Sequence, residues 1–120
     1  MDSYKFIDES FLINLRNETI KSSPMLIESL FELYSESLPT KLSELEAAAT
    51  ERNFQSLIKI AHFLKGQSSC VGAHIFAEDF LKIESLAKKN NLAEISQIIV
   101  YIQRNVIELE NEFKHFLKTK

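Results

Sequence analysis

The feature that most constrains the fold is a long stretch in which apolar residues recur three and four positions apart. The stretch runs from Pro24 to about Thr50, and its apolar positions are Leu26, Ile27, Leu30, Phe31, Tyr34, Leu38, Leu42 and Leu45. This spacing places the apolar side chains on one face of a long amphipathic α-helix. Only two glycines and two prolines occur in 120 residues, which argues against a fold of many tight turns. An all-α fold is therefore expected.

The same spacing predicts four further helices, at about residues 8–18, 53–70, 73–89 and 92–117. Asp8 and Asn53 are suited to cap a helix, and Ser23 is placed to cap one that begins with a proline. Pro39 is expected to interrupt and kink the long helix. Because short connections between long helices favour antiparallel neighbours, we predict an antiparallel up-down four-helix bundle over about residues 23–118, with a short extra N-terminal helix.

Length and charge exclude several classes of protein. The 120 residues, 45 % of them hydrophobic, suit a single domain over residues 1–120. The net charge is −3, with −4 in residues 1–60 and +1 in residues 61–120, so no strongly basic field supports nucleic-acid binding. No apolar run of about 18 residues and no secretory signal occurs, so we expect no membrane span and a cytoplasmic location. One cysteine allows no intramolecular disulfide.

The segment "AHFLKGQSSCVGA", residues 61–73, places a histidine, a lysine and a glycine along one predicted helix. On a helical wheel the core stripe consists of Phe54, Leu57, Ala61, Leu64 and Ser68. His62 lies on the flank of this stripe, surrounded at the spacings that share a helix face by Ile58, Lys65, Gly66 and Ser69. A glycine inside a helix costs about 1 kcal/mol relative to alanine, so we expect Gly66 to have a compensating role.

These residue types suit the transfer of a phosphoryl group onto and off an exposed imidazole. Histidine ordinarily titrates at about pH 6.5, which leaves a large neutral, nucleophilic fraction near neutral pH. Lys65 is suited to pair with an anionic group on the ring, and Gly66 to admit a partner's active site. Ser69 either hydrogen-bonds the phosphoryl group or borders a docking surface. The plainer alternatives are a boundary histidine and a surface lysine without special roles.

This segment resembles the signature of histidine-containing phosphotransfer (HPt) domains, Ala-His-x-Leu-Lys-Gly followed by small residues and a glycine ten positions after the histidine. The matching residues are Ala61, His62, Leu64, Lys65, Gly66, Ser68, Ser69 and Gly72. The resemblance covers nearly the whole chain and implies that His62 is the phospho-acceptor. Glu84 stands where some members carry a glutamine proposed to hydrogen-bond the imidazole. It either orients the ring or is a solvated helix residue.

The resemblance implies a phosphorelay intermediate that accepts a phosphoryl group on His62 from a receiver-domain aspartyl-phosphate and passes it to another receiver aspartate. The implied partners are response-regulator receiver domains or a hybrid histidine kinase, docking near Ile58, Lys59 and Phe63. We expect Ile58 to be exposed and Phe63 to point away from His62. Mg²⁺ is expected in the partner receiver, with no cofactor in this chain. Without a nucleotide-binding glycine motif or kinase signature, the chain is expected to be a monomeric phosphocarrier and not an enzyme.

Two other classes remain as alternatives. One is an interaction-only helical bundle that binds a receiver or kinase without phosphotransfer. The other is a metal-binding bundle, which is disfavoured because His74 and His115 do not fall at ligand spacing with His62. Cys70 is expected to be a buried small residue. The kinase, the receivers, the direction of phosphoryl flow, the pathway output and the question of a stand-alone protein or part of a hybrid kinase stay open.

Overall fold

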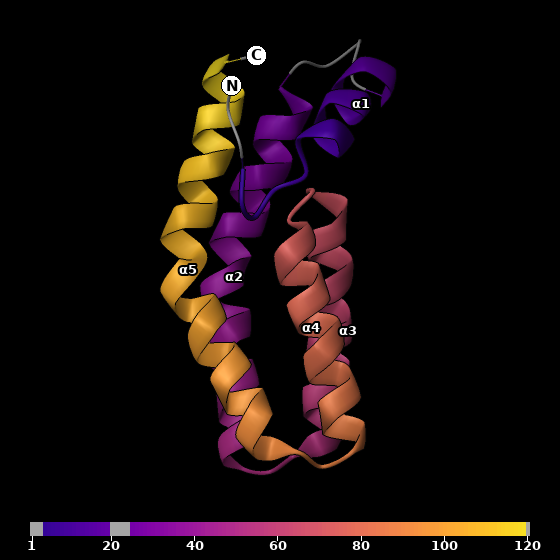
Figure 1. The fold of residues 1–120 in the computed structure, drawn as a ribbon, viewed down its shortest axis with the longest axis vertical. Coiled ribbons are helices and arrows are strands. Elements are labelled where there is room, and N and C mark those ends of the chain that lie inside the picture. Colours follow the sequence, from indigo (N-terminus) through magenta and orange to yellow (C-terminus); the bar gives the residue numbers. More distant parts are fainter. Residues whose placement is uncertain (1–3, 20–24, 120) are drawn as a thin grey trace.

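Five α-helices make up the protein in a computed structural model that describes residues 4–19 and 25–119 (Figure 1). They are α1 (Glu9–Thr19), α2 (Leu26–Thr50), α3 (Phe54–Cys70), α4 (His74–Lys88) and α5 (Leu92–Thr119). In Figure 1, α2 lies beside α5 and α3 beside α4, while α1 sits beyond the turn that joins α3 to α4. The predicted all-α bundle with an extra N-terminal helix is confirmed. None of the described helices is long and apolar enough to cross a membrane.

The core lies between the four long helices and is built from the predicted apolar faces. In α3 the expected stripe is confirmed, because Leu57, Ala61, Leu64 and Ser68 are buried. Large side chains from the other helices and the N-terminal segment complete the core, among them Phe6, Leu38, Leu45, Phe76, Phe80, Ile83, Ile95 and Phe116. Burial of one such side chain stabilises the fold by about 1.5–3 kcal/mol. Rotation of α3 about its axis would expose its buried residues, so this packing fixes which face of α3 points outward.

The three connections between the long helices share one mechanism of chain reversal. Each contains a residue with a left-handed backbone, namely Arg52 (φ 56°), Gly72 (φ 76°) and Asn90 (φ 56°). The N–H of the following residue then donates back to the preceding helix, which is the hydrogen bond of a Schellman cap. Gly72 has a second constraint, because a Cβ on it would lie 3.0 Å from Leu12 Cγ of α1. The predicted reversal at Gly72 is thus confirmed.

The helix starts agree with the sequence, but the effect of one proline does not. Asp8 Oδ1 accepts from the Phe11 N–H at 3.1 Å, and Asn53 Oδ1 accepts from the Ser56 N–H at 3.1 Å, so both predicted caps are present. Ser23 lies outside the described residues. The predicted interruption at Pro39 is wrong, because α2 is continuous through it, and the predicted kink there stays a prediction. Burial of residues on both sides of Pro39 offsets the hydrogen bond that proline cannot donate.

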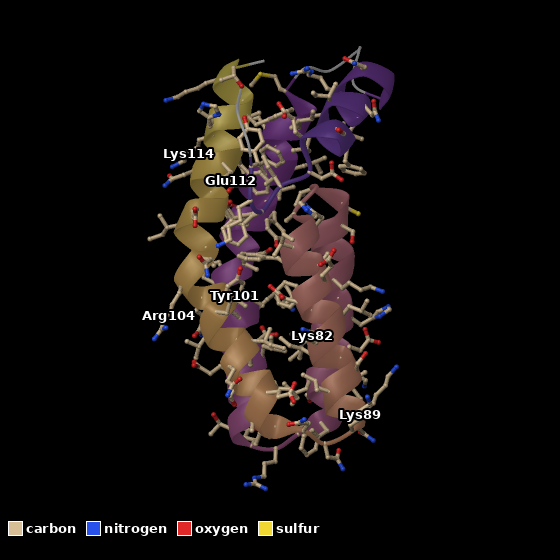
Figure 2. The ribbon with its side chains drawn as sticks, viewed as in Figure 1. Lys82, Lys89, Tyr101, Arg104, Glu112 and Lys114 are labelled. Atoms are coloured by element: carbon tan, nitrogen blue, oxygen red, sulfur yellow. The ribbon has the colours of Figure 1, made fainter. Side chains whose placement is uncertain are left out.

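The segment before α1 is fixed to α5 by the Glu112 carboxylate (Figure 2). Its two oxygens accept three consecutive backbone N–H groups, from Lys5, Phe6 and Ile7, at 2.9, 2.8 and 3.1 Å. The Asp8 N–H then donates to the Gly72 carbonyl at 2.8 Å. Figure 2 also shows Arg104 and Lys114 of α5 pointing away from the bundle. The N-terminal segment therefore carries α1 to the end of the α3–α4 pair.

One carboxylate in α4 is held in an unfavourable environment. The Oδ2 atom of Asp79 is shielded from solvent and has no hydrogen-bond partner among the described residues. Burial raises the pKa of Asp79 from 3.8 to about 6, Lys82 opposes this shift, and the negative charge of Glu78 adds to it. Because the folded state holds this proton more tightly than the unfolded chain, the contribution of Asp79 to stability falls as the pH rises from about 4 to 6.

We therefore expect Asp79→Asn to stabilise the fold at neutral pH but not in acid. One pKa unit corresponds to about 1.4 kcal/mol, and because Asp79 is only half-buried, screening reduces the gain to about 1–2 kcal/mol at pH 7.5. Below pH 4 the wild-type and variant free energies of unfolding should converge. Urea unfolding at both pH values measures this, with Glu108→Gln, an exposed glutamate of α5, as the control. An equal difference at both pH values contradicts the assignment.

Candidate functional site

His62 lies on the exposed side of α3. The helix begins at the Asn53 cap and buries Ala61 and Leu64, which directs His62 away from the core. The side chain of His62 is 66 % exposed. The structure therefore confirms that His62 lies outside the core stripe, on a helix whose rotation is fixed by packing. A rigid scaffold with an accessible ring is the arrangement that a nucleophilic histidine needs.

Glu84 of α4 contacts the ring of His62 from the neighbouring helix. Glu84 Oε1 lies 3.4 Å from His62 Nδ1, and only 13 % of the Glu84 side chain is exposed. Glu84 is thus not the fully solvated helix residue that was one alternative from the sequence. The distance is slightly longer than a hydrogen bond of about 2.7–3.2 Å, so the contact is close but is not a formed hydrogen bond.

The protonation pattern of the neutral ring follows from this contact. Glu84 Oε1 is shielded from solvent and has no hydrogen-bond partner among the described residues. A shielded carboxylate oxygen without a donor is costly, so the tautomer with the proton on Nδ1 is favoured over the alternative. Nε2 then carries the lone pair, and none of the described residues hydrogen-bonds it. Nε2 is therefore the ring nitrogen with an available lone pair.

Lys88 adds a second charge behind Glu84. Its Nζ lies 3.7 Å from Glu84 Oε2, four residues further along α4. Lys88 is 63 % exposed, so this ion pair contributes little to stability, but it partly neutralises the carboxylate next to His62. Sequence reasoning did not single out Lys88, although its i,i+4 spacing from Glu84 is the available signal.

Gly66 leaves open space beside His62. A Cβ built on Gly66 would meet no atom within 4 Å outside the local helix backbone. Nothing in this chain's own packing requires a glycine at that position, in contrast to Gly72. No packing contact among the described residues therefore offsets the cost of about 1 kcal/mol for a glycine inside a helix. The open space is consistent with the predicted role in steric access, which stays a prediction.

An apolar groove runs between α2 and α3 along one side of His62. It has a volume of about 480 Å³ and is lined by Leu30, Leu33, Tyr34, His62, Phe63, Gly66, Gln67, Cys70 and Val71. Two of these apolar side chains are well exposed, Leu33 at 63 % and Phe63 at 48 %. Lys41 of α2 lies over the Phe63 ring, 5.0 Å from its centroid. Lys41 could not be identified from the sequence, because this contact depends on how the helices pack.

Three expectations about exposure require correction. Ile58 was expected to be exposed, but it is partly buried and packs against the core. Phe63 was expected to point away from His62, yet it lines the same groove. Cys70 was expected to be buried and is exposed at the end of α3, because its wheel position faces the groove and not the core. Lys59 is exposed. Docking of a partner at Ile58, Lys59 and Phe63 stays a prediction.

Lys65 and Ser69 lie on the other side of His62. They line a groove between α1, α3 and α4 that also includes His74 and Leu81, with a volume of about 460 Å³. Lys65 is half-buried and Ser69 is exposed. Neither residue forms a hydrogen bond or ion pair with His62 within the described chain. Their predicted roles toward a phosphoryl group therefore depend on that group being present.

The helices that carry the site are tied together beneath it by a buried hydrogen bond. Tyr34 Oη of α2 lies 2.7 Å from Ser68 Oγ of α3. Burial raises the pKa of Tyr34 well above its usual value, although the bond to Ser68 opposes the shift. Tyr34 therefore stays protonated, and its hydroxyl is a lasting partner for Ser68. This fixes one wall of the apolar groove relative to His62.

The remaining histidines lie away from His62. His74 begins α4 and lines the groove that contains Lys65, while His115 Nδ1 is 2.9 Å from the Tyr4 hydroxyl near the end of α5. Within residues 4–19 and 25–119, no group of three or more histidine, cysteine, aspartate or glutamate side chains is arranged to hold a metal ion.

Comparisons with known proteins identify the family and the fold. The family model described as "Hpt domain" matches residues 29–115. Histidine-containing phosphotransfer protein B from Pseudomonas aeruginosa superposes with a TM-score of 0.83 and 23 % identity, covering 98 % of this chain and 99 % of that one. The histidine-containing phosphotransfer domain of ArcB from Escherichia coli gives 0.84 and 17 %, covering 95 % and 94 %. The search of curated proteins finds no match.

Proposed function

The chain belongs to the histidine-containing phosphotransfer (HPt) domain family, and on this basis we propose that His62 is its phospho-acceptor in a phosphorelay. Membership supports a phosphotransfer role in two-component signalling, as a phosphocarrier and not as a kinase. The finer proposal is that His62 accepts a phosphoryl group from a receiver-domain aspartyl-phosphate and passes it to another receiver aspartate. The receiver, with its Mg²⁺, supplies the rest of the chemistry.

The observation that carries the proposal is the environment of the His62 ring. The ring is 66 % exposed, its Nδ1 faces Glu84 at 3.4 Å, and open space lies beside it at Gly66. In the forward step, the Nε2 lone pair attacks phosphorus, the Nε2–P bond forms, and the P–O bond to the aspartate breaks. The aspartate leaves as a carboxylate, while the proton on Nδ1 stays in place. In-line access to Nε2 is what this step requires of the chain.

The apolar groove between α2 and α3 is the surface on which we propose the receiver docks. It borders His62, and its exposed apolar side chains Leu33 and Phe63 provide area for burial against a partner. Lys41 lies over the Phe63 ring and also pairs with Glu44 at 3.4 Å, and the exposed Lys59 precedes His62 by about one turn of α3, so both lysines bring positive charge to this side of the molecule. A receiver's acidic phosphorylation site would be attracted to this charge.

Transfer of labelled phosphate from a receiver tests the proposal. A receiver domain labelled on its aspartate with ³²P is incubated with the chain, and the label is followed by gel. We expect label on this chain that is lost in acid and retained in alkali, the behaviour of a phosphorus–nitrogen bond. Receiver binding without any transfer of label would favour the interaction-only bundle instead. Stoichiometric zinc in the purified protein would favour the metal-binding alternative.

A further inference from the structure

The structure assigns Glu84 a role in the phosphorylated state that goes beyond orienting the free ring. We propose that its carboxylate keeps Nδ1 of phosphorylated His62 protonated, so that the phosphoryl group departs from a ring that becomes neutral imidazole. This inference rests on the proposed function, because it concerns the ring after phosphorylation at Nε2. Glu84 is a positioning residue in this role, since it acts through Nδ1 and not on phosphorus.

The chemistry of the return step depends on that proton. The attacking aspartate oxygen of the receiver forms a bond to phosphorus, the Nε2–P bond breaks, and its electron pair returns to Nε2. With a proton on Nδ1, the departing ring is neutral imidazole. Without that proton the departing ring is an imidazolate anion, which is a much poorer leaving group. Retention of one proton on Nδ1 therefore decides how readily the phosphoryl group is passed on.

The geometry favours retention of this proton. A phosphorylated ring protonated on Nδ1 carries a positive charge on the imidazole, and Glu84 Oε1 lies 3.4 Å from Nδ1 in a position shielded from solvent. An opposite charge at that distance favours the charged form of the ring, and it does so more strongly where water is excluded. A neutral amide at residue 84 would provide a hydrogen-bond acceptor without the charge. The carboxylate is on the Nδ1 side, so the ring separates it from the phosphoryl group.

The other charges around the ring act in the opposite sense. Lys59 and Lys65 of α3 lie one turn before and after His62, and Lys41 of α2 lies over Phe63 across the groove. Lys88 of α4 pairs with Glu84 at 3.7 Å and reduces its effective charge. Each lysine disfavours a positive ring, whereas Glu84 is the carboxylate in contact with Nδ1. Removal of Glu84 should therefore weaken the hold of Nδ1 on its proton, whereas removal of Lys88 should leave that hold unchanged or strengthen it.

The test is a pH titration of three phosphorylated proteins: wild type, Glu84→Gln and Lys88→Gln. Each is phosphorylated with phosphoramidate, a small donor, and the ³¹P chemical shift of phosphorylated His62 is followed upward from pH 6. We expect the midpoint for loss of the Nδ1 proton to fall by at least about one pH unit in Glu84→Gln. In Lys88→Gln the midpoint should equal or exceed that of wild type. The rate of phosphoryl loss should follow the same midpoint in each protein.

The outcomes separate this inference from the proposed function. Phosphorylation of His62 with the same midpoint in wild type and Glu84→Gln would overturn the inference and leave His62 as the phospho-acceptor. A lowered midpoint in Lys88→Gln would also overturn it, because the direction would not follow the charge. A chain that takes up no phosphoryl group on His62 from either phosphoramidate or a phosphorylated receiver contradicts the proposed function, and the inference fails with it.

Discussion

We expect replacement of His62 by glutamine to abolish phosphoryl uptake and to leave the fold intact. The variant loses the nucleophilic Nε2, and no other described side chain is placed to replace it, so labelling should fall at least about a thousandfold. The ring is 66 % exposed and outside the core, so the free energy of unfolding should change by no more than about 0.5 kcal/mol. Receiver-to-chain transfer of ³²P and urea unfolding measure the two effects.

His74→Gln is the matched control, because His74 lies in the same domain at the start of α4 and no hydrogen bond or ion pair joins it to His62 in the described chain. It should accept label as wild type does. Equal labelling of wild type and His62→Gln would show that another residue carries the phosphoryl group. Loss of labelling together with unfolding of His62→Gln would contradict the peripheral position of this side chain.

We expect replacement of Gly66 by leucine to block transfer from a receiver while stabilising the helix. Because a Cβ at this position meets no atom within 4 Å, the variant should gain close to the 1 kcal/mol that a glycine costs inside a helix. The added side chain projects beside His62 into the space where a receiver must approach. A displacement of about 1 Å at a reacting centre costs about a hundredfold in rate, so a loss of at least about tenfold is expected.

A small phosphodonor provides the control for Gly66→Leu. Phosphoramidate needs no docking surface, so its reaction with His62 should proceed at the wild-type rate in the variant. Gly66→Ala, with a smaller side chain, should be as stable and should lose less transfer. If Gly66→Leu accepts phosphate from the receiver at the wild-type rate, Gly66 does not act as a steric opening.

Patterns within single segments of the sequence predicted most of the fold. They failed where the conformation depends on how the helices pack against one another. The apolar spacing predicted the five helices, and the capping residues Asp8 and Asn53 predicted where two of them begin. Both features depend only on residues close together in the sequence. Pro39 was misjudged because a local rule predicts a break, whereas burial of its neighbours on α2 maintains the helix. The left-handed Arg52 had no signal, since arginine has no preference for that conformation.

In the candidate site, too, the residues placed by one helix were predicted, and those placed by packing between helices were not. His62 and its exposed position follow from the periodicity of one helix, so the wheel located them correctly. The contact with Glu84 joins two helices and entered only through the resemblance to a family, and the structure then supplied its atoms and distance. The groove residues Phe63 and Lys41 were missed or misplaced, because a wheel of one helix does not show what the neighbouring helix leaves uncovered.

The most direct test of phosphoryl transfer through this chain is to identify the atom that carries the phosphoryl group. Protein with ¹⁵N-labelled histidine is phosphorylated by a receiver, and the nitrogen bonded to phosphorus is identified by ³¹P–¹⁵N coupling. The geometry predicts coupling to Nε2 of His62, with the proton on Nδ1. Coupling to Nδ1 of His62, coupling to His74 or His115, or the absence of any phosphohistidine would contradict it.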